Sequence, residues 1–421
     1  MSPMPETHPA PQSKEAQTEH QISDVQEADC CIVGGGPAGV VLAYLLARKG
    51  LRVCLLEMHT DFDRDFRGDT IHPSVLEVMD QLGLAERLHE MRHSKIRSFN
   101  IQVGDDEGVT IELGFLKTKY PYIMMLPQAH FLEFMTEEAK KFPGFQLIMG
   151  ASVQELIREG GAVRGVRYRE HEDDEWHEVR AALTVGADGR SSRVRRLAEM
   201  ELVKTAPPMD VLWFRLPRRE GDPEGVAGRI RNGHILVMLD RMEEWQIAFV
   251  ILKGSYHHLR EAGVEQLKRL VVETDPTLSD RIDHLQEWKQ VSMLSVESSR
   301  LKQWYQPGLL LIGDAAHVMS PVGGVGINYA IQDAVVAANV LTKPLTSKSL
   351  QTNHLARVQR KRKWPTRFIQ AFQAVIQKRI LANALDTSKQ FKLPFFLRLP
   401  LLRRIPARLI AFGIWPVRVE N

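Results

Sequence analysis

Four glycines stand within six positions, 34–39, and this cluster constrains the chain more than any other feature. Glycine is costly inside regular structure, so such a cluster marks a place where another group approaches the backbone closely. The apolar run at 28–33 reads as a short buried strand, 37–49 as an apolar helix, and 51–56 as a second strand. This order predicts a compact βαβ unit.

The spacing of three of these glycines is typical of a dinucleotide-binding turn. Gly34, Gly36 and Gly39 form G-x-G-x-x-G, in which the first makes a tight turn, the second admits a pyrophosphate and the third lets helix and strand pack closely. Glu57 follows at the end of the second strand, where a carboxylate accepts hydrogen bonds from ribose hydroxyls. The unit predicts a bound dinucleotide, and NAD and FAD use the same construction.

Composition indicates a globular chain with room for two units, because its 421 residues are 44% hydrophobic and 25% charged. Residues 1–27 are polar and rich in Pro, Gln and Glu, so we expect a disordered tail without a signal peptide. Cys30, Cys31 and Cys54 lie in apolar contexts without metal-ligand spacing. We therefore expect buried thiols, no metal site and a cytoplasmic location.

Basic residues gather near the end of the chain. Residues 357–421 carry fifteen Lys or Arg but only two acids, Asp386 and Glu420, while the net charge of the whole chain is +3. The slightly acidic remainder argues against a nucleic-acid partner. The apolar segment 391–419 contains arginines and is interrupted by Pro394, Pro400 and Pro406, so it cannot span a bilayer. We expect it to pack on the protein, with weak peripheral contact to an anionic membrane as the alternative.

Two further motifs each follow an expected strand. The strand at 182–187 runs into Asp188-Gly189, and the strand at 309–312 runs into Gly313-Asp314 and a glycine-rich turn. Together, GGGPAG, GADGRSSRVR and GDAAHVMSPVGGVGIN resemble the fingerprint of the FAD-dependent aromatic hydroxylases typified by para-hydroxybenzoate hydroxylase, over about residues 28–375. The resemblance implies an α/β fold: a Rossmann-like FAD-binding domain, an inserted antiparallel-sheet substrate domain and a C-terminal helical segment.

The resemblance also divides the chain. The FAD-binding domain is expected from residues 28–96, 126–205 and 301–380, the substrate domain from 97–125 and 206–300, and the basic apolar C-terminal segment from 381–421. Within the substrate domain, alternating apolar residues predict strands at 211–218, 225–232, 234–241 and 244–252. Asn232-Gly233 predicts a tight hairpin turn between two of them.

Further cofactor contacts follow from the resemblance. Asp314 falls on the residue that binds the flavin ribityl chain, and Asp188 and Gly189 on a motif that serves both FAD and the nicotinamide cofactor. A helix beginning near Gly326 or Ile327 would direct its positive end at the flavin ring. The expected cofactor-binding residues are Gly34, Gly36, Ala38, Gly39, Glu57, Arg67, Gln128, Asp188, Gly189, Asp314, Gly326 and Ile327.

The implied reaction is a monooxygenation. NADH or NADPH reduces noncovalent FAD, the reduced flavin captures dioxygen as a C4a-hydroperoxide, and one oxygen passes to an aromatic or other electron-rich organic substrate. The resemblance places Pro321, Gly324 and Asn328 beside the ring, while His72 is a candidate base for a phenolic substrate. His317 belongs to a structural turn of the family and is not expected to be catalytic. Candidate substrate residues are Trp213, Arg215, Arg229, Met238, Trp245 and Phe249.

Three other functions remain open at this point. A flavin-dependent reductase of prenyl groups or a halogenase would share the cofactor domain, although the chain lacks the W-x-W-x-I-P tract that accompanies flavin halogenases. A flavin-binding protein without turnover is the third. Neither the substrate identity nor the oligomeric state follows from the sequence.

Overall fold

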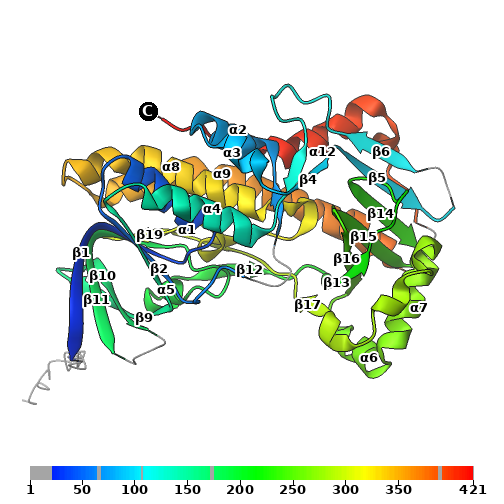
Figure 1. The fold of residues 1–421 in the computed structure, drawn as a ribbon, viewed down its shortest axis with the longest axis horizontal. Helices are drawn as coiled ribbons and strands as arrows, with labels where there is room; N and C mark the ends of the chain where they lie inside the picture. The colour runs from blue at the N-terminus through cyan, green and yellow to red at the C-terminus, as the bar shows by residue number, and fades with distance from the viewer. Residues whose placement is uncertain (1–20, 64–67, 106–107, 171–174, 387–390, 421) are drawn as a thin grey trace, which may run out of the picture.

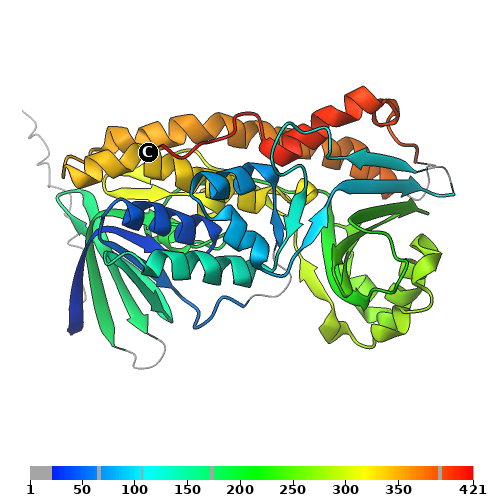
Figure 2. The same cartoon turned by 45° about the horizontal axis from the view of Figure 1, so that its top comes forward.

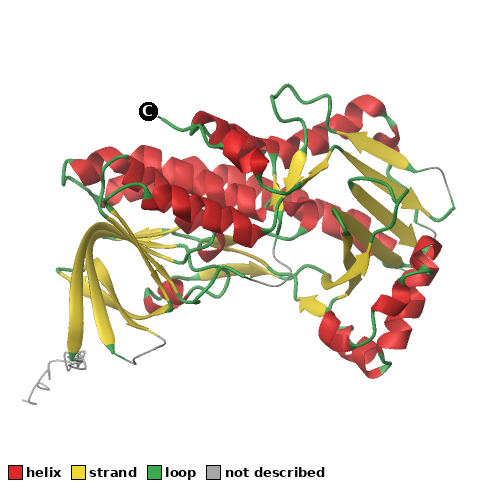
Figure 3. Cartoon of the chain, in the orientation of Figure 1, coloured by secondary structure: helices red, strands yellow, loops and turns green. Residues whose placement is uncertain are grey.

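A computed structural model describes residues 21–63, 68–105, 108–170, 175–386 and 391–420. Two large sheets lie at opposite ends of an elongated molecule, and two long helices, α8 (Gly326–Thr346) and α9 (Thr352–Ile376), run from the first sheet towards the second (Figure 1). Figure 2 shows the same arrangement with the helical edge turned forward, and Figure 3 separates helices from strands by colour.

The first sheet has eight strands in the order β19-β20-β11-β1-β2-β8, with β10 joined to β11 and β9 to β10. Its strands are β1 (Ile22–Val33), β2 (Val53–Glu57), β8 (Phe145–Met149), β9 (Ala151–Glu159), β10 (Ala162–Glu170), β11 (Trp176–Gly186), β19 (Tyr305–Gln306) and β20 (Leu309–Leu311). β8, β2, β1, β11 and β20 are parallel. The glycine motifs at 34–39, 188–189 and 313–314 therefore meet at one edge, where these parallel strands end.

The predicted βαβ unit is confirmed as β1, α1 (Pro37–Arg48) and β2. One boundary was wrong, because residues 22–27, expected in the disordered tail, form the first half of β1. They pair in parallel with residues 176–180 of β11, so the partner strand satisfies a backbone whose polar side chains carried no strand signal. The three cysteines are buried and unpaired, and burial raises the pKa of each thiol.

The second sheet has seven strands in the order β17-β13-β16-β15-β14-β5-β6. They are β5 (Ser98–Val103), β6 (Val109–Glu112), β13 (Met209–Pro217), β14 (Val226–Arg231), β15 (His234–Arg241), β16 (Glu244–Leu252) and β17 (Ser292–Leu294). The four predicted strands are thus confirmed. Asn232 and Gly233 both take positive φ, 51° and 76°, as the tight hairpin turn between β14 and β15 requires.

This sheet buries both faces. Its outer face packs against α7 (Val264–Thr274) through Leu212, Phe214, Ile247 and Phe249. Its inner face, with Val211, Ile235 and Val250, packs against Val322 and the C-terminal residues Ala384 and Leu385.

Shorter strands and helices connect the two large sheets. Two three-stranded sheets are formed by β3 (Thr70–Ile71), β7 (Ile123–Met125) and β4 (Ser94–Ile96), and by β12 (Leu202–Thr205), β18 (Ser298–Leu301) and β21 (His317–Val318). The remaining α-helices are α2 (Pro73–Gln81), α3 (Ala85–Glu90), α4 (Gln128–Lys140), α5 (Arg193–Leu197), α6 (Tyr256–Glu261), α10 (Ala382–Ala384), α11 (Phe395–Arg398) and α12 (Pro400–Phe412). Among the described residues, no helix has both the length and the hydrophobicity to cross a membrane.

Gly39 provides a test of the glycine turn. A Cβ at this position would lie 1.9 Å from the carbonyl oxygen of Gly34, which is rigid backbone. We expect Gly39→Ala to lower the free energy of unfolding by about 2 kcal/mol or more, measured by urea denaturation. Gly114→Ala is the matched control, because no atom lies within 4 Å of its Cβ position, and it should change stability by less than about 0.5 kcal/mol. Equal stability of the two variants would contradict the close approach of Gly39 to the Gly34 carbonyl.

Candidate functional site

The glycine turn leaves space at one position and none at its neighbours. Gly34 has φ +106°, and a Cβ there would lie within 2.7 Å of Ala187 and Asp188. At Gly36 the backbone is extended, and a Cβ would meet no atom within 4 Å. Gly36 therefore borders open space at the N-terminus of α1, the kind of place where a helix binds phosphate.

Glu57 is tied to this turn. Its Oε2 accepts a hydrogen bond from the amide of Gly35 at 2.7 Å, and its Oε1 accepts from the amide of His59 at 3.0 Å. The carboxylate is thereby held at the end of β2 beside the glycines.

Asp188 lies against the same turn from the end of β11. Its Oδ2 accepts from the amides of Arg193 and Val194 at 2.7 and 3.0 Å and so caps α5. Among the described residues, its buried Oδ1 has no hydrogen-bond partner, and burial raises the pKa of this carboxyl. Gly189 has φ +78°, which allows the chain to reverse here. An orphaned acceptor beside the glycine turn suits a ligand that carries hydroxyl groups.

Asp314 lies in the short 3-10 helix Gly313–Ala315, directly after β20, and Ile312 rather than Asp314 occupies the N-cap. A Cβ on Gly313 would lie 3.2 Å from the Cβ of Ala38, so this turn packs on the start of α1. The motif residues Ala38 and Asp314, far apart in sequence, are thus brought to one place.

A buried ion cluster holds this turn. The carboxylate of Asp333 on α8 lies 2.6 Å from His317 Nε2 and 2.6 Å from Arg362 Nε, and it accepts from the amide of Gly313 at 3.0 Å. Burial acts to raise the pKa of Asp333, but His317 and Arg362 hold it below its ordinary value. His317 is therefore a structural residue, as expected. Sequence reasoning missed Asp333 and Arg362, because only the packing of α9 on α8 brings them together.

Arg195 was also missed. It is 6% exposed, and its guanidinium donates to the carbonyl oxygens of Ala315 and Arg190 at 2.9 and 2.7 Å. It thus joins the Asp188 motif to the Asp314 turn. The sequence feature that could have identified Arg195 is its place in the GADGRSSRVR motif, three residues after Ser192.

The loop from Pro321 to Gly324 precedes α8 and is held from the opposite side. The carbonyl oxygen of Gly324 accepts from Thr70 Oγ1 at 3.1 Å and from Asn328 Nδ2 at 3.3 Å. Asn328 Oδ1 accepts from the amide of His72 at 3.0 Å, and Asn328 is 2% exposed. Asn328 therefore fixes the loop and the start of α2 to one another. Gly326 begins α8, so its helical amides follow immediately after this loop.

His72 is fully buried beside this loop. Its Nδ1 lies 2.8 Å from the carbonyl oxygen of Ile410 in α12, so Nδ1 carries a proton and Nε2 is an acceptor. Among the described residues, Nε2 has no partner. Burial lowers the pKa of His72 to about 4. A base with so low a pKa is weak at neutral pH, so the contacts favour packing of the loop over the predicted role as a general base.

Gln128 and Ile327 border the same region. Gln128 begins α4, where its amide donates to Asp69 Oδ1 at 3.1 Å and its side chain reaches the carbonyl oxygen of Gly68 at 3.4 Å. A Cβ on Gly68 would lie 3.4 Å from Ile327 Cδ1. The predicted cofactor residue Arg67 lies outside the described residues.

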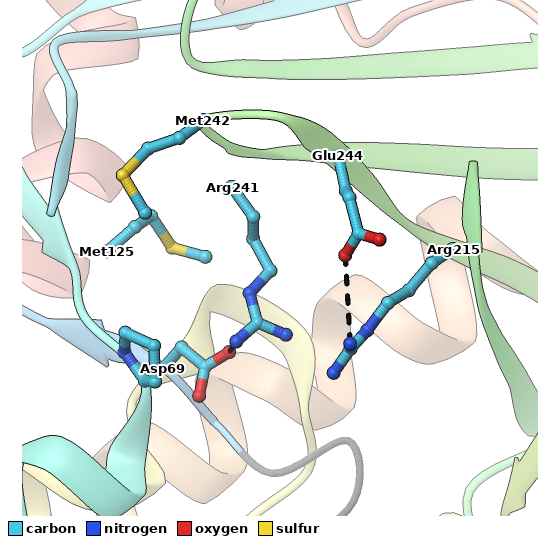
Figure 4. A pocket seen from close by; sticks show the side chains of 7 residues that line it. Asp69, Met125, Arg215, Arg241, Met242 and Glu244 are labelled. Atoms are coloured by element: carbon cyan, nitrogen blue, oxygen red, sulfur yellow. Dashed lines mark ion pairs between the residues drawn. The ribbon is translucent and has the colours of Figure 1, made fainter. Parts of the chain in front are cut away.

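A pocket of about 130 Å³ opens between the two sheets (Figure 4). Asp69 and Pro127 line it from the segments before β3 and α4, and Arg215 and Arg241 line it from β13 and β15 of the seven-stranded sheet. Asp69 pairs with Arg241 at 3.1 Å, and Arg215 pairs with Glu244 at 3.6 Å. Burial raises the pKa of Asp69, although Arg241 opposes this effect. Of the predicted substrate residues, Arg215 is the one that this pocket contains.

The other predicted substrate residues divide between the two faces of the sheet. Trp213 packs on the inner face, in the cluster that includes Val322. Met238, Trp245 and Phe249 instead belong to the core between the outer face and α7, away from the loop. Arg229 also lies on the α7 side, because it pairs with Asp275 at the end of α7 at 3.2 Å. Strand periodicity shows which residues share a face, but the packing of other elements decides which face borders the loop.

These observations fit FAD. The open space at Gly36, the fixed carboxylate of Glu57, the orphaned oxygen of Asp188 and the start of α8 suit the phosphates, the hydroxyls and the ring of a flavin dinucleotide.

Comparison with known proteins agrees. Residues 27–370 match the model of a family described as "FAD binding domain", and the chain belongs to this family. It is 32% identical to 6-methylpretetramide 4-monooxygenase of Streptomyces rimosus over 406 residues, which cover 95% of this chain and 96% of that protein. The protein is an FAD-dependent monooxygenase that uses NADH or NADPH as reductant, as the sequence motifs predicted.

Solved structures show the same fold. PqsL of Pseudomonas aeruginosa in complex with 2-aminobenzoylacetate superimposes with a TM-score of 0.74 and 20% identity, covering 86% of this chain and 98% of that chain. The myxobacterial chondrochloren halogenase CndH gives the same TM-score at 18% identity, covering 92% of this chain and 90% of that chain. The fold is thus shared by oxygenating and halogenating flavoproteins, and it does not choose between them.

Gly36→Val tests the position of the dinucleotide. The backbone of Gly36 suits any residue and its Cβ position is open, so the variant should fold normally while its branched side chain occupies the phosphate position. We expect FAD binding to weaken at least about tenfold, or 1.4 kcal/mol, in fluorescence titration of the apoprotein. The thermal unfolding midpoint of the apoprotein should remain that of the wild type. Normal flavin affinity in this variant would show that the dinucleotide binds elsewhere.

The lowered pKa of His72 makes stability depend on pH. Between about pH 6.5 and 4 the unfolded chain binds a proton at His72 that the folded chain does not, so stability falls on acidification through this window. We expect His72→Asn, which retains a donor for Ile410, to remove up to about 1.4 kcal/mol per pH unit of this slope in urea denaturation. The exposed His258→Asn serves as the control and should retain the wild-type slope. An unchanged slope in His72→Asn would rule out this contribution.

Proposed function

We propose that the protein hydroxylates an apolar aromatic substrate that binds against the inner face of the seven-stranded sheet, beside the Pro321–Gly324 loop. The observation that carries this proposal is the shared cluster in which Val322 of the loop packs with Trp213, Val211 and Ile235 of the sheet. Such a cluster offers aromatic and aliphatic contacts directly beside the loop. The similarity to 6-methylpretetramide 4-monooxygenase over nearly the whole of both chains supports a fused-ring phenol as the substrate class.

In this proposal the eight-stranded sheet and its helices form the FAD-binding domain, and the seven-stranded sheet forms the inserted substrate domain. Gly36 borders the pyrophosphate, Glu57 binds the adenosine ribose, and Asp314 binds the ribityl chain. The amides at the start of α8 stabilise negative charge on the reduced ring. Bound FAD supplies the oxygen-transfer chemistry.

The protein has three further tasks in this proposal. Asn328 fixes the loop beside the ring through its bonds to Gly324 and His72. The inner sheet face orients the substrate, and the apolar residues around Val322 exclude water from the reaction.

Turnover by the purified holoenzyme tests the proposal. With NADH or NADPH, a panel of simple and fused-ring phenols should include one that stimulates consumption of the reductant. Under labelled dioxygen, mass spectrometry should find one labelled oxygen atom in the product. Bromide- or chloride-dependent halogenation would instead identify a halogenase, a reduced product without added oxygen a reductase, and no stimulation by any substrate a flavin-binding protein.

A further inference from the structure

The helices α9 and α12 expose large apolar side chains on a strongly basic surface. On α9, Trp364, Phe368 and Val375 are 62%, 46% and 55% exposed, and on α12, Leu401, Leu402 and Ile405 are 72%, 41% and 59% exposed. Both helices lie along the same edge of the molecule in Figures 1 and 2. Ile410 of α12 packs beside Ile369 and Phe372 of α9, which makes the two helices neighbours. We call these six exposed side chains, with the cations around them, the basic apolar face.

The exposed apolar residues of α12 are different from the residues of this helix that pack on the protein. Its inner side already packs against the inner sheet face, through Ala407, Ala411 and Phe412 in a cluster with Ile111 and Val226. This confirms the expectation that the C-terminal segment packs on the protein. The same helix nevertheless carries Leu401, Leu402 and Ile405, which lie outside this contact and are exposed. A helix that is apolar on both sides is stable when both sides are covered.

The charged residues on the two helices themselves have one sign. Residues 352–385 and 391–419 contain no Asp or Glu. Exposed cations flank the apolar residues on both helices: Arg357, Arg360, Lys361 and Arg367 on α9, and Arg404 and Arg408 on α12. Arg367 also stacks on Trp364, 5.5 Å from its ring centre. Exposed Trp and Phe among Lys and Arg on an amphipathic helix are typical of a membrane-surface contact.

A recess beside α9 extends the positive surface. It has a volume of about 280 Å³, and Arg300, Lys302, Lys363 and Arg367 line it. Lys302 pairs with the exposed Glu201 at 2.8 Å. The lining contains no carboxylate, so the recess suits a phosphate group.

We propose that the basic apolar face docks on an anionic phospholipid bilayer, with its apolar side chains in the interface and its cations on the lipid phosphates. A second copy of this chain is a poorer occupant, because a symmetric contact would place the cations of both copies against one another. The membrane therefore satisfies both features of the face, its apolar area and its charge.

Docking here would place the bilayer next to the candidate site. The carbonyl oxygen of Ile410 on α12 binds His72, and a Cβ on Gly323 would lie 3.3 Å from Ile410 Cγ1. One helix thus separates the basic apolar face from the loop beside the flavin. This consequence rests on the proposed function, whereas the docking itself does not.

Vesicle sedimentation of the full-length holoenzyme tests the proposal without reference to turnover. At low salt the protein should bind vesicles of phosphatidylcholine with phosphatidylglycerol, should not bind pure phosphatidylcholine, and should be released at high salt. Lys361→Glu with Arg408→Glu should weaken binding more than tenfold, and Leu401→Ser with Ile405→Ser should also weaken it. The controls lie outside α9 and α12: Arg260→Glu with Lys289→Glu, and Leu252→Ser at the end of β16, should bind as the wild type does.

Three results would overturn the proposal. The first is no binding to anionic vesicles at low salt, and the second is an equal loss of binding in the control variants. The third is a concentration-dependent dimer in solution that Leu401→Ser with Ile405→Ser dissociates, which would assign the face to a second copy. None of these readouts depends on the substrate, so failure here is distinguishable from failure of the proposed function.

Discussion

The buried carboxylate of Asp333 orders the centre of the molecule. It binds His317 after the Asp314 turn, Arg362 from α9 and the amide of Gly313 within the turn. Removing one partner of such a buried group typically costs about 3 to 5 kcal/mol, because it leaves a charge without compensation in a low dielectric. The position of Asp314 thus depends on α8 and α9 being packed together. These two helices run from the first sheet towards the second, so the same cluster links the Asp314 turn to the overall architecture.

The two faces of the seven-stranded sheet have different tasks. Its outer face packs on α7 and forms a closed core. Its inner face meets Val322 of the Pro321–Gly324 loop together with residues from the end of the chain. The C-terminal segment therefore completes the wall of the candidate site, and α12 also binds His72 through the Ile410 carbonyl. The same helix carries the exposed apolar side chains that the proposed membrane contact uses, so its two sides connect the site to the surface.

The meeting of the three motifs in the candidate site could be predicted from the sequence. The glycines of the first turn, Asp188 and Asp314 each follow a strand, and parallel strands bring their carboxyl ends to one edge. Four of the seven strands of the second sheet, β13 to β16, were predicted closely, because alternation and the Asn232-Gly233 turn are local signals. The start of β1 was missed, because the backbone pairing that stabilises residues 22–27 comes from β11, about 150 residues later.

The sequence by itself determined that this chain has a dinucleotide-binding βαβ unit, two further flavin motifs and four antiparallel strands, because each depends on residues close together along the chain. Only the tertiary structure added the parallel strand β5 to this sheet and decided which sheet face borders the Pro321–Gly324 loop. It therefore placed Trp213 in the cluster with Val322 of the loop, and Met238, Trp245 and Phe249 in the core against α7. It also decided that His72 is buried with a lowered pKa, and that α12 packs on one side and is exposed on the other. These properties depend on contacts between segments up to 338 residues apart, and a local sequence pattern does not specify such long-range contacts.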